Sequence, residues 1–186
     1  MSQNLRIHKL DVEILSILQS RASLSKAEIA RRVGLTPTAV FERIRKLEEN
    51  GVIRGYAAQL DPATLGRRLL AFVHVTVDEA NADPDTGDRL AAVPGAEEVH
   101  RVAGEDGWLI KLRVAGPDEL HETLRAEVHP LAGVRSVRTS IVLNTVAENQ
   151  PLPLEEMDPA PTHVEPIPTL RWAVHAPAWG SRVGKE

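Results

Sequence analysis

The chain has 186 residues, of which 42% are hydrophobic and 26% charged, with 22 lysines and arginines, 26 aspartates and glutamates, and no cysteine. This length allows one or two small domains, and the lack of cysteine excludes disulfides and cysteine-bound metals. No apolar run reaches the ~18 residues that a membrane-spanning helix needs, and the first residues lack the apolar stretch of a signal peptide, so we expect a cytoplasmic protein.

The charge is unevenly distributed along the chain. Residues 1–60 carry a net charge of +4, residues 61–148 carry −6, and residues 149–186 carry −2. A basic first third followed by an acidic remainder is typical of a nucleic-acid-binding head joined to a body that avoids nucleic acid.

Residues 5–66 are expected to form the head. Apolar residues at helical spacing predict helices over residues 8–20, about 25–33 and 37–49. Residues 52–60 then read as a short strand or wing, and a linker follows at Asp61-Pro62 and Gly66.

The boundaries of the second and third helices have clear sequence signals. Ser25 and Glu28 fit a capping box at the start of the second helix. Gly34 ends that helix, and Thr36 and Pro37 begin the next one. Two short helices joined by a glycine-containing turn, the second of them basic, predict a helix-turn-helix DNA reader.

The face of the third helix that does not enter the core supplies the predicted DNA contacts. We expect Thr36 and Thr38 to hold a phosphate at the helix N-terminus, Arg43 to contact guanine and Glu42 to contact cytosine. We expect Arg45, Lys46 and Arg54 to contact the DNA backbone. Ala39 lies on the same exposed face. The alternative is a solvated basic face in which Glu42 pairs with Lys46. Phe41 is expected to pack against the first helix.

Residues 67–147 are expected to form a second, α+β domain. Strands are predicted over residues 69–77, 97–103, 108–114 and 134–142. One helix ends at Ala92 and another spans residues 117–128, giving the order βαββαβ of a ferredoxin-like sheet. Two helices cover one face of such a sheet, so we expect the other face to be buried against a second copy.

Residues 148–186 form a proline-rich extension. Seven of the thirteen prolines lie between residues 149 and 186, which excludes a regular helix or central strand and predicts an extended, partly disordered segment. Trp172 and Trp179 leave two interpretations open: a solvated linker, or a segment whose end docks on its own or a neighbouring subunit.

Two stretches, residues 33–56 and residues 104–111 within the βαββαβ module, resemble the Lrp/AsnC family of transcriptional regulators. The resemblance covers about residues 5–147. It implies a winged helix-turn-helix head, a ligand-sensing RAM-type body, homodimers formed through the open sheets, often octameric rings, and responsiveness to amino acids. It therefore implies sequence-specific binding to double-stranded DNA as the function.

The resemblance also implies an effector site at Gly104-Glu105-Asp106-Gly107-Trp108. The family pattern there is Gly-Asp-aromatic-Asp. This chain keeps the glycine as Gly104 and has Glu105 in place of the first aspartate. Asp106 stands at the aromatic position, and Gly107 replaces the second aspartate. An acidic side chain at this place pairs with the α-ammonium group of an amino acid. The alternative is a tight hairpin with solvated acids, with Trp108 used for packing.

Catalytic and metal sites are not predicted. His74, His100, His121 and His129 are scattered over different elements, and no phosphate loop, nucleophile elbow or carboxylate pair occurs. No cofactor is expected beyond a small-molecule effector. The enzymatic alternative is a related fold that decarboxylates a tetrapyrrole of the sirohaem type, for which His100 and Arg101 would face the propionates. A body that only assembles or senses, with DNA binding secondary, is a third possibility.

Overall fold

The computed structural model describes residues 7–78, 80–104 and 107–154. Within this part of the chain, residues 7–59 and 147–154 form one compact unit, here called the head, and residues 60–146 form a second, the body. The chain therefore passes from the head to the body and returns to the head. None of the helices described is long and apolar enough to cross a membrane.

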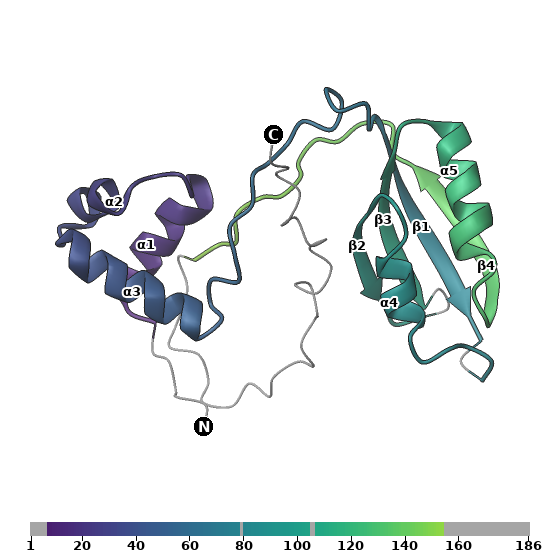
Figure 1. Cartoon of the computed structure of the whole chain (residues 1–186), viewed down its shortest axis with the longest axis horizontal. Helices are drawn as coiled ribbons and strands as arrows, with labels where there is room; N and C mark the ends of the chain where they lie inside the picture. Colours follow the sequence, from purple (N-terminus) through teal and green to yellow (C-terminus); the bar gives the residue numbers. More distant parts are fainter. Residues whose placement is uncertain (1–6, 79, 105–106, 155–186) are drawn as a thin grey trace, which may run out of the picture. The chain divides into compact units, whose positions relative to one another are not determined.

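Three helices make up the head (Figure 1): α1 spans Lys9–Ser20, α2 spans Lys26–Val33 and α3 spans Pro37–Glu49. Their apolar faces meet in a core of five buried residues: Ile14, Ile29, Ala30, Val40 and Ile44. Burying one such valine or isoleucine side chain contributes roughly 1.5–3 kcal/mol, so this small core fixes how α2 and α3 lie against α1. The three predicted helices are confirmed to within one residue.

The turn between α2 and α3 follows from its sequence. Gly34 has φ of 69°, the left-handed conformation that ends α2, and the N–H of Leu35 donates to the carbonyl of Ala30 at 2.9 Å. The Thr36 hydroxyl oxygen accepts from the N–H of Ala39 at 3.2 Å, which caps α3. At α2 the Ser25 hydroxyl accepts from the N–H of Glu28, but the reciprocal half of the predicted capping box is not formed.

Residues 52–60, expected as a short strand or wing, form no strand. That segment has no regular structure, and its first two amide groups, those of Val52 and Ile53, donate to the carbonyl of Leu47 at the end of α3. A strand needs a neighbour to take its hydrogen bonds, and the described part of the head contains no strand with which this segment would pair.

The described part of the body contains four strands, two α-helices and one π-helical turn (Figure 1). Their bounds are β1 Leu69–Val77, α4 Thr86–Ala91, β2 Ala96–Arg101, β3 Trp108–Val114, α5 Pro117–Thr123, the π-helical turn η1 Leu124–Val128, and β4 Val134–Ile141. The strand order is β2-β3-β1-β4 with antiparallel neighbours throughout. The predicted ferredoxin-like βαββαβ fold is confirmed, although the helix predicted over residues 117–128 is α-helical only as far as Thr123.

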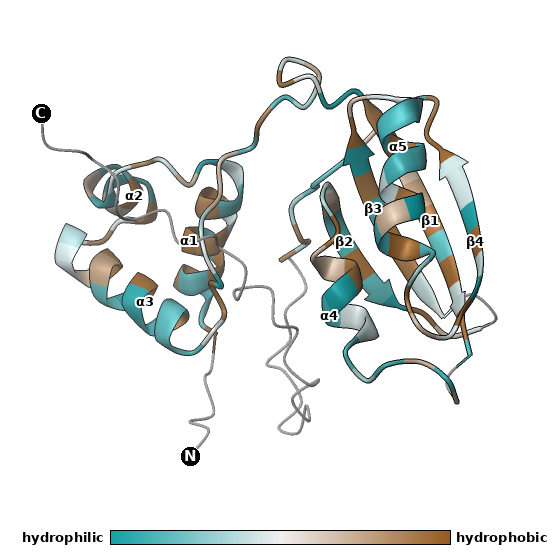
Figure 2. Ribbon diagram, turned by 45° about the vertical axis from the view of Figure 1, so that its right-hand side comes forward, coloured by the Kyte–Doolittle hydropathy of each residue, from teal (hydrophilic) through white to brown (hydrophobic). Residues whose placement is uncertain are grey.

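One face of the sheet packs against the helices. The buried core residues are Ala71, Val73, Val75, Leu90, Val93, Ile110, Leu112, Val114, Leu120, Val128 and Leu131. The central strands carry most of this hydrophobic surface, whereas the edge strand β4 is largely hydrophilic and exposed (Figure 2). No helix within the described residues covers the other face, here called the open face (Figure 1).

Candidate nucleic-acid interface and effector loop

The outward surface of α3 is strongly polar. Thr38, Arg45 and Lys46 are exposed, while Val40, Ile44 and Leu47 face the core. The first turn of α3 carries no acidic residue, so its N-terminal dipole is not neutralised by a carboxylate there. This end of the helix can therefore attract a phosphate group.

Thr36 and Thr38 frame this N-terminus. Thr36 is exposed and uses its hydroxyl oxygen to cap the helix, which leaves the hydroxyl hydrogen able to donate. Thr38, the second residue of α3, is exposed, and Ala39 next to it is half-buried. The small side chain of Ala39 leaves room for close approach of a ligand to the backbone at this turn.

Arg43, the predicted guanine contact, is engaged inside the head. Its Nη1 lies 2.8 Å from Oδ1 of Asp11 on α1, and the side chain of Asp11 is only 9% exposed while that of Arg43 is 33% exposed. The other carboxylate oxygen of Asp11 accepts from the N–H of His8 at 2.9 Å. This ion pair joins α1 to α3 across the core, and it favours a role for Arg43 in positioning α3.

Arg45 lies between two carboxylates on the exposed face of α3. Its guanidinium is 2.8 Å from Glu42 and 2.7 Å from Glu49. Hydrogen bonding to Glu42 and then the charges of both carboxylates raise the pKa of Arg45. Glu42 thus pairs with Arg45 instead of the Lys46 partner that the alternative interpretation predicted.

A similar cluster lies on α2. The Glu28 carboxylate is 2.6 Å from Arg31 and 3.2 Å from Arg32. Hydrogen bonds from Arg31 first and Arg32 second lower the pKa of Glu28. Exposed pairs of this kind contribute little to stability, so a phosphate can replace the carboxylate at small cost.

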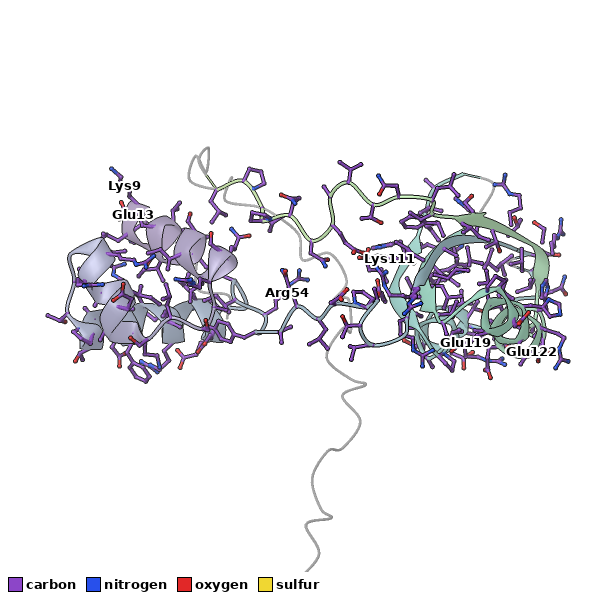
Figure 3. The ribbon with its side chains drawn as sticks, turned by 90° about the horizontal axis from the view of Figure 1, so that it is seen from above. Lys9, Glu13, Arg54, Lys111, Glu119 and Glu122 are labelled. Carbon is purple, nitrogen blue, oxygen red and sulfur yellow. The ribbon has the colours of Figure 1, made fainter. Side chains whose placement is uncertain are left out.

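The neighbouring aromatic residues have specific partners. Phe41 is 42% exposed, and the ammonium group of Lys26 on α2 lies 4.3 Å from the centre of its ring. Tyr56, beyond the end of α3, donates to Glu48 at 2.9 Å, and burial followed by this hydrogen bond raises its pKa to about 12. Arg54, also predicted as a DNA contact, is exposed in the segment that follows α3 (Figure 3).

The predicted effector loop closes as a hairpin between β2 and β3. The N–H of Val102 donates to the carbonyl of Gly107 at 2.9 Å, and Gly104 and Gly107 have φ of 116° and 73°. Glu105 and Asp106, the predicted acidic residues, lie outside the described residues. Of the five predicted effector residues, the described ones are therefore the two hairpin glycines, Gly104 and Gly107, and Trp108.

Trp108 packs at the base of this loop. The guanidinium of Arg101 lies 4.9 Å from its ring, and a side chain added at Gly87 on α4 would come within 2.5 Å of the ring. Its indole Nε1 is buried and has no hydrogen-bond partner among the described residues. The loop thus offers one unused donor and one cation beside it, groups that suit a carboxylate.

The open face of the sheet carries charged residues as well as apolar ones. Lys111 on β3 is 7% exposed, pairs in register with Phe72, and has its ammonium group 3.2 Å from both Glu97 and Glu98. Figure 3 shows Lys111 on the opposite side of the sheet from Glu119 and Glu122 of α5. His100 contacts Glu98 at 3.1 Å, which is the main reason why the pKa of Glu98 is lowered.

The described residues contain no group of histidine, aspartate or glutamate side chains able to hold a metal ion. The two tail tryptophans, Trp172 and Trp179, lie outside the described residues.

Sequence comparisons match both units. Residues 7–54 match a winged helix-turn-helix DNA-binding domain and residues 70–152 match the Lrp/AsnC ligand binding domain. The leucine-responsive regulatory protein of Haemophilus influenzae is 34% identical over 157 residues, covering 82% of this chain and 93% of that protein. The protein of the same name from Escherichia coli K12 is 35% identical over 150 residues, covering 78% and 90%.

Solved structures give the same result. The leucine response regulatory protein of Mycobacterium tuberculosis superposes with a TM-score of 0.68 at 33% identity, covering 77% of this chain and 97% of that one. A transcriptional regulator of Neisseria meningitidis in complex with L-methionine superposes with a TM-score of 0.73 at 26% identity, covering 80% and 97%. These relatives are regulators, which gives no support to the tetrapyrrole-enzyme alternative.

Proposed function

The chain belongs to the Lrp/AsnC family of DNA-binding transcriptional regulators, and from this premise we propose that it reads DNA with the exposed face of α3. The observation that carries the proposal is the capped, acid-free N-terminus of α3 beside an exposed basic surface. Thr36 and Thr38 bind a phosphate there, Ala39 and Glu42 face the base edges, and Lys46 and Arg54 contact the DNA backbone.

Arg45 and Arg43 take different roles in this proposal. Arg45 exchanges its carboxylate partners for a DNA phosphate, because both of its ion pairs are exposed and therefore weak. Arg43 keeps its pair with the buried Asp11 and holds the angle of α3. Its direct contact with guanine stays a prediction that requires this pair to open.

A matched pair of arginine variants tests the reading surface. Arg45 and Arg125 each lie on a helix, 2.8 Å from a glutamate three residues earlier, but Arg125 belongs to the body. With a duplex selected by the wild-type protein from a random pool, Arg45→Gln is expected to weaken binding and reduce the salt slope by about 1, whereas Arg125→Gln changes neither. Equal effects of the two variants, or no enriched sequence, would contradict the proposal.

We propose one role for each part of the chain. We propose DNA binding for residues 5–66, effector sensing and assembly for residues 67–147, and a proline-rich extension over residues 148–186, whose described part, residues 148–154, belongs to the head. We also place the protein in the cytoplasm, where its DNA lies.

We propose a small amino acid as the effector, bound at residues 104–108. The unused Nε1 donor of Trp108 and the neighbouring guanidinium of Arg101 support recognition of the α-carboxylate, and Glu105 or Asp106 would take the α-ammonium group. Thermal-shift screening of the common amino acids, with L-methionine and L-leucine included, tests this. A ligand that raises the melting temperature of the wild type but not of Trp108→Phe is expected, and no response to any amino acid would contradict it.

We propose that the open face of the sheet is the homodimer interface. The near-complete burial of Lys111 between Glu97 and Glu98 supports this, because a paired lysine can be covered by a second copy at lower cost than an unpaired one. Sedimentation of Phe72→Asp is expected to show a shift toward monomer, with Glu122→Gln on the helical side of the body as the control. Whether dimers assemble further into octamers is tested by the same measurement.

A further inference from the structure

The chain returns to the head after the body, and its last described residues contact α1. The carboxamide of Gln19 pairs with the backbone of Leu152, 133 residues away: the N–H of Leu152 donates to Gln19 Oε1 at 2.8 Å, and Gln19 Nε2 donates to the carbonyl of Leu152 at 3.2 Å. Figure 1 shows this segment, in light green, reaching the helices of the head. One side chain thus satisfies both hydrogen-bonding groups of one peptide unit.

The sequence around Leu152 suits it for such capture. Pro151 and Pro153 flank it and have no N–H, so Leu152 supplies the only backbone donor of the three residues. Pro153 also restricts Leu152 to extended conformations, which lowers the entropy that docking removes. Asn149, with φ of 53°, lies at a bend where the segment begins, and asparagine is one of the few residues that adopts this conformation readily.

Gln19 is exposed, and both of its hydrogen bonds to Leu152 lie at the surface, beside one buried residue of α1. Leu15 lies four residues before Gln19 and therefore on the same side of α1. It is only 8% exposed, although it does not belong to the buried core cluster of the three helices. The side chain of Leu152, in contrast, is 70% exposed, so the attachment depends on the backbone and not on that side chain.

We propose that Gln19 docks residues 149–154 of its own chain onto α1 as a strap that ties the head to the body at a second point. The first connection runs through residues 50–68 after α3, and the strap adds one from the end of β4 to α1. Two tethers allow the head fewer orientations than one, and this favours simultaneous binding of two DNA half-sites by a dimer. That last step rests on the proposed function, whereas the docking itself does not.

Hydrogen exchange of the Leu152 amide in the full chain tests the docking without DNA. Gln19→Ala is expected to speed that exchange about two- to tenfold, the range that one hydrogen-bonded pair supports, while the amides of α1 keep their protection. Gln59→Ala, an exposed glutamine of the head, serves as the control and is expected to change nothing. Unchanged exchange in Gln19→Ala would overturn the proposal.

Cross-linking identifies which chain supplies the strap. The protein has no cysteine, so Ser20→Cys with Gln150→Cys gives a single pair for a short bismaleimide. A cross-linked product of single-chain mass is expected. A product of double-chain mass would overturn docking within one chain and assign the strap to a second copy.

Two substitutions of one residue separate the backbone contact from the side chain. Leu152→Pro removes the N–H and keeps the extended conformation, whereas Leu152→Ala keeps the N–H and removes only an exposed side chain. On a duplex with two half-sites, Leu152→Pro is expected to bind about two- to tenfold more weakly than Leu152→Ala, with equal binding to a single half-site. Equal binding of both variants to the longer duplex would overturn the tether role. If the wild-type protein bound no DNA specifically, that result would contradict the proposed function. Docking of the strap would then be decided by the hydrogen exchange of the Leu152 amide alone.

Discussion

The ion pair between Asp11 and Arg43 allows a quantitative prediction about the head. Asp11→Ala removes a carboxylate that is 9% exposed, lies 2.8 Å from the guanidinium and also accepts from the N–H of His8. Removing one member of a fully buried pair costs about 3–5 kcal/mol, and an exposed pair is worth at most about 1 kcal/mol. Because the guanidinium is one third exposed and can be partly rehydrated, we expect a loss of about 2–3 kcal/mol in the free energy of unfolding.

Urea unfolding followed by far-ultraviolet circular dichroism measures this loss. With a slope of about 1 kcal/mol per molar urea for so small a helical unit, the midpoint of the transition is expected to fall by about 2–3 M. Glu13→Gln, which removes a carboxylate from the same helix (Figure 3), is expected to shift the midpoint by less than about 0.5 M.

A double-mutant cycle isolates the pair itself. Asp11→Ala, Arg43→Ala and the double variant should give a coupling energy of about 1.5–3 kcal/mol, the range for hydrogen bonds between charged groups. Asp11→Ala should also weaken DNA binding although Asp11 is buried, since α3 loses its anchor to α1. A coupling energy near zero would refute the assignment of Arg43 as the residue that positions α3.

Three further outcomes are expected. Glu49→Gln removes a carboxylate next to Arg45 and should strengthen DNA binding and steepen its salt dependence, as seen by fluorescence anisotropy; weaker binding would contradict the exchange of carboxylate for phosphate. Gly87→Ala places a methyl group 2.5 Å from the ring of Trp108 and should destabilise the body by about 1–3 kcal/mol in urea, whereas wild-type stability would mean that the ring moves freely. Hydrogen bonds from the N–H of Ala115 and then from Arg67 lower the pKa of Glu119. The Glu119 carboxylate therefore contributes to folding stability above the ordinary glutamate pKa, and this contribution is lost as the pH falls through the lowered value. Glu119→Gln should lower the melting temperature at neutral pH, and the difference from the wild type should vanish in acid.

Local sequence signals predicted the helices and the sheet well. The limits of α2 and α3 follow from Ser25, Gly34 and Thr36, whose capping interactions involve neighbours three or four residues away. The order of strands and helices in the body follows from the alternation of β-branched runs with polar helical segments. In each case the decisive contacts lie within a single element or at its ends.

The partners of individual charged side chains were not predictable in this way. Arg43 pairs with Asp11, which lies 32 residues earlier in the sequence. Glu42 forms its ion pair with Arg45, although Lys46 lies four residues along the same helix. The strand expected over residues 52–60 failed because a strand depends on a neighbour that its own sequence does not encode. Long-range pairing of this kind needs the three-dimensional arrangement, and the same is true of Gln19 with Leu152.

The order of strands in the sheet also bears on how the protein avoids aggregation. β2 and β4 are the outer strands, and an outer strand presents unpaired backbone groups on which another chain can add. Here those strands carry exposed Glu97, Glu98 and Arg101 on one edge and Arg135 and Arg138 on the other. Charged side chains on an outer strand oppose the addition of another chain, so uncontrolled growth of the sheet into fibres is disfavoured while its face stays available for specific assembly.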